Sequence, residues 1–201
     1  MKQRATFLSF IQPTALFGRA DRSVTALLKD QRGAGAIEFA ILLPILIVLY
    51  AGAVEFNDAF TAKRKVTSAA SGIGDVVTRT KELSSATLKD VLDWAPVTIL
   101  KPYPVAGANT DIKVTCVAID KDKIATVKWS ETRDSQKDQV GAKISLPAGV
   151  VLASSKLVAV EMTYKYKPTL GAYLGDEILF TSKFYFKPRV QGTVCYNDVC
   201  C

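Results

Sequence analysis

The four cysteines are the residues of this chain whose chemistry is easiest to define. They are Cys116, Cys195, Cys200 and Cys201. Four thiolates could bind zinc, but the last three lack the two-residue spacing that is typical of zinc ligands. We therefore expect neither a metal nor any other cofactor. An even number of cysteines instead favours disulfides in an oxidising compartment.

Four cysteines can form three complete sets of disulfides. Cys200 and Cys201 are adjacent in the chain and adjacent cysteines rarely bond to each other, which leaves two arrangements open. In both arrangements Cys195 bonds to one of the adjacent pair, and Cys116 bonds to the other. We expect one or two disulfides of this kind.

Residues that could support catalysis are scarce. The chain has no histidine, which excludes histidine-based triads and histidine metal sites. It has no glycine-rich phosphate-binding loop, and no nucleophile can be paired with a general base. We therefore expect no enzymatic activity and no small-molecule substrate.

The longest apolar segment follows a basic leader. Residues 39–54, FAILLPILIVLYAGAV, carry no charge, and extending the segment back to Ala34 adds only Glu38. About 20 such residues are enough to cross a bilayer as a helix. Large aliphatic residues occur on every helical face, which favours a lipid environment over a buried core. We expect a single transmembrane helix over 34–56.

The charge distribution predicts the orientation of this helix. Residues 1–33 hold six basic and two acidic residues, so the net charge of +7 falls to +3 beyond them. Positive flanks stay in the cytoplasm, which places the N-terminus inside and the C-terminal part in the periplasm. The basic balance thus indicates topology, and no nucleic-acid partner is expected.

A short motif precedes the apolar segment. In RGAGAIEF, Gly33 follows a basic residue, Glu38 lies five positions later and Phe39 comes next. This motif resembles a type IV prepilin processing site, which implies cleavage between Gly33 and Ala34 by a prepilin peptidase on the cytoplasmic face. A carboxylate in hydrocarbon is costly and needs a positive partner. Cleavage would supply one, the new α-amine of Ala34.

The wider segment 34–78 resembles the TadE-like family of the tight-adherence pilus system. The features that carry this resemblance are Gly33, Glu38–Phe39, Pro44 inside the helix, Glu55–Phe56 at its end, and the small residues 67–72. The resemblance implies a minor pilin or pseudopilin that takes part in assembling a Flp-type (type IVb) pilus. The implied partners are the inner membrane, the prepilin peptidase, other Tad pilus-assembly proteins and pilin subunits. Glu38 and Phe39 would serve recognition during assembly.

A second interpretation keeps the same topology without processing. In it the chain is an uncleaved, membrane-tethered periplasmic adaptor or binding module of a secretion or pilus apparatus. The two interpretations differ in whether the mature protein begins at Ala34 or at Met1.

Beyond the membrane the sequence predicts a pilin-like α+β fold. Apolar residues at three- and four-residue steps, Phe56, Phe60, Val66, Ala70, Ile73 and Val77, extend the first helix to about residue 80. A short second helix is expected over 84–94, started by a hydroxyl cap and ended before Pro96.

From residue 96 onward the apolar pattern changes to a period of two. It predicts four strands of an antiparallel sheet, at 112–119, 124–129, 157–166 and 178–186. The polar segment 130–148 predicts an exposed loop whose charges are solvated.

Four parts result from these expectations. They are a cytoplasmic leader (1–33), the transmembrane helix (34–56), a periplasmic helical extension with the short helix (57–94), and a β-rich periplasmic domain (95–201). The apolar stripe of the long helix needs a cover, either the β domain or other subunits in a bundle, and we expect it to pack on the β domain.

Overall fold

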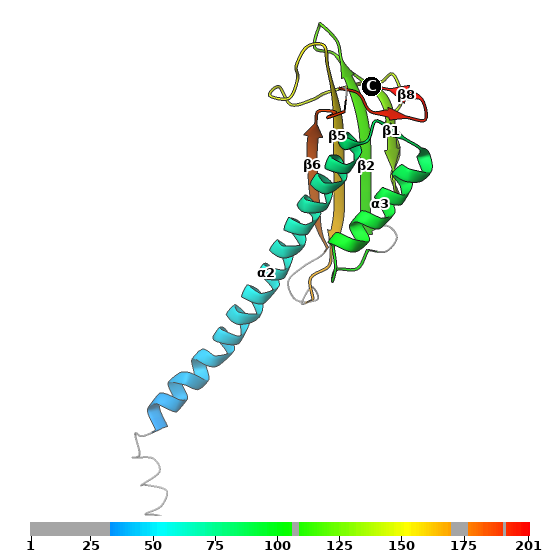
Figure 1. Cartoon of the computed structure of the whole chain (residues 1–201). Coiled ribbons are helices and arrows are strands. Elements are labelled where there is room, and N and C mark those ends of the chain that lie inside the picture. The colour runs from blue at the N-terminus through cyan, green and yellow to red at the C-terminus, as the bar shows by residue number, and fades with distance from the viewer. Residues whose placement is uncertain (1–32, 106–108, 170–176, 191) are drawn as a thin grey trace, which may run out of the picture. The chain divides into compact units, whose positions relative to one another are not determined.

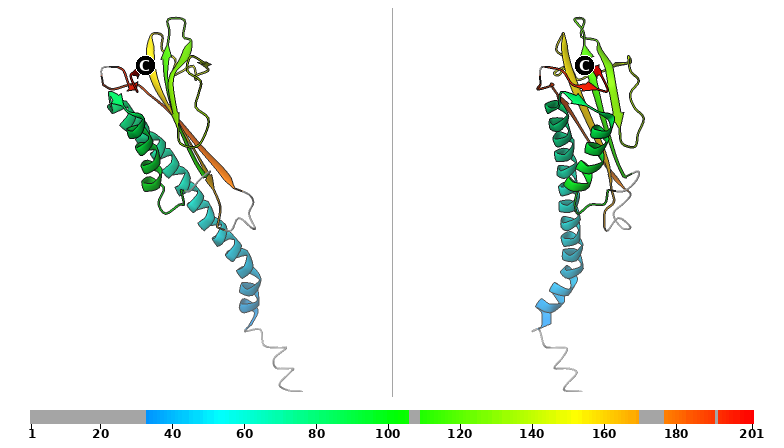
Figure 2. Two further views of the ribbon diagram at one scale, coloured as in Figure 1. Left: turned by 90° about the vertical axis from the view of Figure 1, so that its right-hand side faces the viewer. Right: turned by 45° about the vertical axis from the view of Figure 1, so that its right-hand side comes forward.

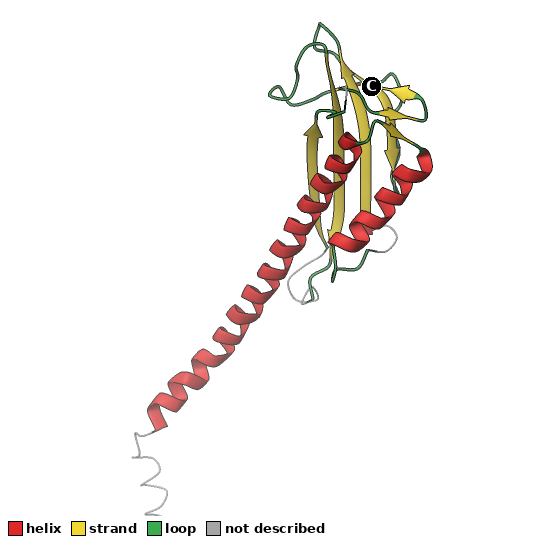
Figure 3. Ribbon diagram, viewed as in Figure 1, coloured by secondary structure: helices red, strands yellow, loops and turns green. Residues whose placement is uncertain are grey.

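The computed structural model describes residues 33–105, 109–169, 177–190 and 192–201. The chain divides into two units, one ending at Ala51 and one running from Gly52 to Cys201, and each is described by itself. Apart from Gly33, the predicted leader lies outside the described residues. Helices, strands and loops are distinguished in Figure 3.

Helix α2 spans Ala34–Arg79, which confirms the long N-terminal helix. Within the first unit its apolar side chains are exposed on every face. Within the second unit one stripe of small and aliphatic side chains is buried, formed by Ala62, Val66, Ala69, Ala70, Ile73 and Val77. These residues recur at three- and four-residue steps, so they share one face of the helix.

Phe56 and Phe60 do not belong to this stripe, although the periodicity assigned them to it. They are 73% and 52% exposed and stack on each other on the other side of α2. The stripe starts instead at Glu55, which is buried. The buried face of α2 thus begins with a carboxylate, one position before the phenylalanine at which the periodicity had begun it.

Helix α3 spans Ser85–Ile99 and continues through Pro96, so its predicted end before Pro96 was wrong. Ser84 caps its start, because the hydroxyl accepts a hydrogen bond from the Thr87 amide at 3.1 Å. Pro96 lies in the last turn, where its missing N–H removes one hydrogen bond. Leu92, Ala95 and Pro96 are buried, and burial of apolar side chains favours the helical turn that holds them.

The main sheet is antiparallel and has the strand order β4-β3-β2-β5-β6. Its strands are β2 (Thr110–Ile119), β3 (Ala125–Thr132), β4 (Lys143–Ile144), β5 (Ser155–Tyr166) and β6 (Ile178–Phe186). The four long strands confirm the antiparallel sheet, whereas the two-residue β4 was not predicted. Figure 1 shows β5 between β2 and β6.

Both helices of the second unit cover the same face of this sheet, as Figure 2 shows from the side. Side chains from both layers form one core cluster, in which the sheet contributes Ile112, Val114, Cys116, Val158, Val160 and Met162. The register aligns Val114 with Val160 and Ile112 with Met162 across β2 and β5. Alternation along each strand therefore points every second residue at the helices.

The opposite face of the sheet holds a smaller apolar cluster. Val117, Ile119, Ala125 and Leu157 are buried there beneath Ile144, Leu146, Val150 and Val151. Segment 130–148 is therefore not simply an exposed loop: β3 extends into it and β4 lies within it. Glu131, which was expected to be solvated, is 1% exposed.

A second, small sheet joins the end of the described chain to the connection between the helices. Its order is β1-β7-β8, with β1 at Glu82–Leu83, β7 at Cys195–Tyr196 and β8 at Val199–Cys200. Strand β7 runs parallel to β1 and antiparallel to β8.

Gly74 should tolerate no side chain, because a Cβ there would overlap the ring of Phe186 on β6. We expect Gly74→Ala to lower the free energy of unfolding, since overpacking costs about 1–3 kcal/mol. This exceeds the roughly 0.5–1 kcal/mol that alanine gains over glycine inside a helix. Denaturant unfolding of the full chain in detergent, followed by near-UV circular dichroism, measures the effect.

Gly72→Ala is the matched control for that substitution. Its Cβ would meet only Ile99 Cδ1 at 3.8 Å, an ordinary contact, so stability should hold or rise. Equal unfolding free energies for the Gly74 and Gly72 variants would contradict the packing of Phe186 on α2.

Candidate functional site

The predicted processing and recognition residues lie together at the start of α2. Gly33 immediately precedes the helix and Ala34 is its first residue. Glu38 and Phe39 follow within the second turn, and both are exposed. Glu38 is four residues from Ala34, and residues at this spacing are neighbours on a helix surface. An amine formed at Ala34 would therefore lie within one turn of this carboxylate.

The helix that carries these residues is apolar and uncovered. Among the described residues, α2 is the one helix long and apolar enough to cross a membrane. Large side chains such as Ile41, Val48 and Leu49 are 65–70% exposed. Exposed apolar surface of this extent indicates contact with a membrane or with other proteins. Pro44 is accommodated inside the helix without ending it.

Glu55 is the first polar residue of α2 to be buried. Its Oε1 accepts hydrogen bonds from the backbone N–H of Thr169 at 2.7 Å and from the hydroxyl of Tyr166 at 3.4 Å. Burial and the nearby Glu55 carboxylate raise the pKa of Tyr166 to about 12, which keeps the phenol neutral. Glu55 thus attaches α2 to the segment that follows β5.

Lys65 makes a second polar connection from α2. Its ammonium donates to the carbonyl of Ile99 at 3.5 Å and also to the carbonyl of Lys101. These carbonyls lie at the C-terminal end of α3, where the helix dipole favours a cation. Lys65 therefore serves the packing of α3 on α2.

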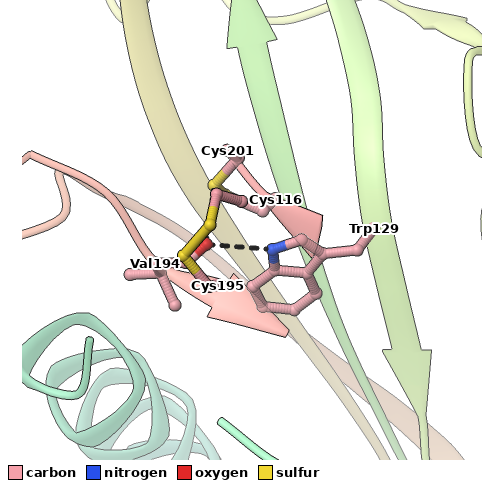
Figure 4. The surroundings of a disulfide bond; sticks show 6 residues. Cys116, Trp129, Val194, Cys195 and Cys201 are labelled. Carbon is pink, nitrogen blue, oxygen red and sulfur yellow. Dashed lines mark hydrogen bonds between the residues drawn. A yellow bond between two sulfur atoms is a disulfide. The ribbon is translucent and has the colours of Figure 1, made fainter. Parts of the chain in front are cut away.

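The second unit contains two disulfides that involve its C-terminal segment. Cys116 bonds to Cys201, and Cys195 bonds to Cys200. Disulfides were expected, and this pairing is one of the two arrangements that the sequence left open. Figure 4 shows the Cys116–Cys201 bond beside Trp129, whose indole N–H donates to the Val194 carbonyl at 3.2 Å. The central strand β2 is thereby joined covalently to the C-terminal segment.

A buried carboxylate next to these disulfides ties β3 to β7. Glu131 accepts hydrogen bonds from the Lys137 ammonium at 2.8 Å and from the Tyr196 hydroxyl. Burial alone would raise the pKa of Glu131, but these hydrogen bonds outweigh burial and lower it. Burial and Glu131 together raise the pKa of Tyr196 to about 12. Within the described residues, no group of histidine, cysteine or acidic side chains is arranged to hold a metal ion.

An exposed apolar N-terminal helix followed by a second helix and an antiparallel sheet defines a pilin-like α+β chain. Residues 33–73 match the family model described as TadE-like protein, so the chain carries a TadE-like domain over that range. Gly33, Glu38, Phe39 and Glu55 lie within the match, and the four cysteines lie outside it. No curated protein and no solved structure matches the chain.

Three polar residues of structural weight were not recognised from the sequence. Glu55 had a signal, because it lies on the helical face of Ala62, Val66 and Ala69, where a carboxylate must be buried with donors. Lys65 had none, since the carbonyls that it binds are remote in the sequence. For Glu131 the partner Lys137 is six residues away, but Tyr196 is 65 residues away and is brought near only by the tertiary fold.

Removal of the two disulfides should affect stability unequally. The Cys116–Cys201 bond links residues 85 apart, and the Cys195–Cys200 bond links residues five apart. Loop-closure entropy assigns about 4–5 kcal/mol to the first loop and about 2 kcal/mol to the second. We expect Cys116→Ala/Cys201→Ala to lose more unfolding free energy than Cys195→Ala/Cys200→Ala. Denaturant titration of both variants without reductant tests this, and a larger loss in the second variant would contradict it.

Proposed function

We propose that this chain is a minor pilin or pseudopilin that takes part in assembling a tight-adherence pilus. The observation that carries the proposal is the match of residues 33–73 to the TadE-like family. In this role the chain is a structural component and not an enzyme. Its partners are the inner membrane, a prepilin peptidase, other Tad pilus-assembly proteins and pilin subunits.

In this proposal α2 anchors the chain in the inner membrane through residues 34–56. At 1.5 Å per residue, 21 residues from Ala34 to Val54 extend about 31 Å, which suits a hydrocarbon core of about 30 Å. The positive leader keeps the N-terminus in the cytoplasm, and the second unit folds in the periplasm. The two disulfides support this placement, because disulfides persist in oxidising compartments.

Processing between Gly33 and Ala34 is the second element of the proposal. It is supported by the position of Ala34 as the first residue of α2 and by Glu38 one turn later. Cleavage would leave a positive α-amine near the carboxylate, or available to the carboxylate of a neighbouring subunit. The pair would offset the cost of holding either charge in an apolar environment.

The processing step predicts a shorter mature chain. Co-expression with the cognate prepilin peptidase should remove 33 residues, and Gly33→Ala should block this removal, because the peptidase site requires glycine before the cut. N-terminal sequencing of the membrane-bound protein gives the answer directly. Gly35→Ala is the control and should still be cleaved. A wild-type protein that begins at Met1 in piliated cells would instead favour the uncleaved adaptor.

The role of Glu38 predicts a separable assembly defect. Glu38→Gln keeps the size and hydrogen bonding of the side chain but removes its charge, so insertion and cleavage should be normal while pilus-dependent attachment falls. Glu38→Ala should behave in the same way. The measurement is surface attachment of cells that have either variant as their single copy, at matched protein level and processing. Wild-type attachment by both variants would reduce Glu38 to an interfacial residue.

A further inference from the structure

The exposed face of α2 in the second unit carries aromatic and cationic residues that take no part in the core or in the proposed processing. Phe56 and Phe60 stack with 6.4 Å between ring centroids and remain exposed. Lys63 and Arg64 follow one turn later, and residues three and four apart share a helix face. Aromatic rings followed by cations occur where a helix leaves a membrane, since rings favour the interface and long cations reach its charged groups.

The two cations are not neutralised by the protein. Within the described part of the chain, Lys63 and Arg64 take part in no ion pair. Glu55 is buried on the packed side of α2. Asp58 lies near Tyr103, whose pKa is raised by burial and by the Asp58 carboxylate. Asp75 lines the other end of the groove described below, about three turns on, where it is paired with Arg79 and Arg189. The positive charge of this face is therefore concentrated at Lys63 and Arg64.

A surface groove of about 680 Å³ begins at these cations. Phe60 lines one end of the groove, and the hydroxyls of Thr67, Ser68 and Ser71 lie farther along α2. Phe184 of β6 contributes an apolar side wall. Ammonium and guanidinium groups form charge-assisted hydrogen bonds to phosphate oxygens, and these are stronger than hydrogen bonds between neutral groups.

We infer that Lys63 and Arg64, at the Phe60 end of this groove, bind the phosphodiester headgroup of an anionic phospholipid in the periplasmic leaflet of the membrane. The inference rests on the membrane anchoring in the proposed function. Lys63 lies nine residues beyond Val54, about 13 Å along the helix. The headgroup layer accounts for about 5–7 Å of that distance, and the long cationic side chains reach back across the remainder.

Lipid selectivity of the full chain tests this inference. The protein is reconstituted in nanodiscs of mixed phosphatidylethanolamine and phosphatidylglycerol, and the lipids that stay bound are counted by native mass spectrometry. For K63Q/R64Q we expect retained phosphatidylglycerol to fall at least about fivefold, since one cation near an anionic surface contributes roughly that factor. The matched control is K121Q/K123Q, which removes two charges from an exposed turn and should retain lipid as the wild type does.

The outcomes distinguish this inference from the anchoring on which it rests. Flotation with vesicles reports anchoring, and a wild-type chain that fails to float would overturn both. If every variant floats and K63Q/R64Q retains phosphatidylglycerol like the wild type, the lipid site is wrong and the anchor stands. Loss of binding to another pilus protein with lipid retention intact would make this face a protein-docking surface and would also overturn the lipid site.

Discussion

The contact between α2 and the main sheet is the interaction on which the second unit depends. Small side chains on the buried stripe, Ala62, Ala69 and Ala70, let the helix approach the strands closely. Gly74 extends this close approach, because the ring of Phe186 occupies the space where a Cβ would be. A hydrogen bond of 3.0 Å between the hydroxyls of Thr67 and Ser182 adds a polar connection between α2 and β6. The close packing of α2 on the sheet therefore depends on small residues along the buried face of the helix.

This contact also determines which side chains of α2 remain exposed. Glu55 and Phe56 are consecutive, yet the carboxylate is buried and the aromatic ring is 73% exposed. The inversion has a physical reason: Glu55 faces backbone and hydroxyl donors, whereas Phe56 needs only an apolar neighbour, which Phe60 and a membrane can supply. Hydrophobicity alone would have placed the two residues the other way round.

Parts of the fold that depend on residues close together in the sequence could be predicted, and parts that depend on distant residues could not. The long helix and the four long strands have periodicities that extend over many residues, and their bounds could be predicted to within a few positions. The continuation of α3 through Pro96 accompanies the burial of Leu92, Ala95 and Pro96 in the tertiary structure, and the hydrogen bond between Glu131 and Tyr196 joins residues that are 65 positions apart. The resemblance of residues 33–73 to the TadE-like family was recognisable because the spacing of its features is local. The cysteine pairing was not unique, since spacing cannot say whether Cys200 or Cys201 faces β2.

The Cys116–Cys201 bond has a mechanical consequence. If the chain has the proposed pilus role, a subunit that is drawn out of a bilayer or held in a fibre carries tension along its backbone. An unfolded stretch of 85 residues would lengthen by up to about 300 Å under such a load, because an extended chain spans roughly 3.5 Å per residue. The disulfide between β2 and the C-terminal segment encloses this stretch in a covalent loop. A pulling force at the two ends of the chain therefore cannot extend residues 117–200, even when it disrupts the sheet.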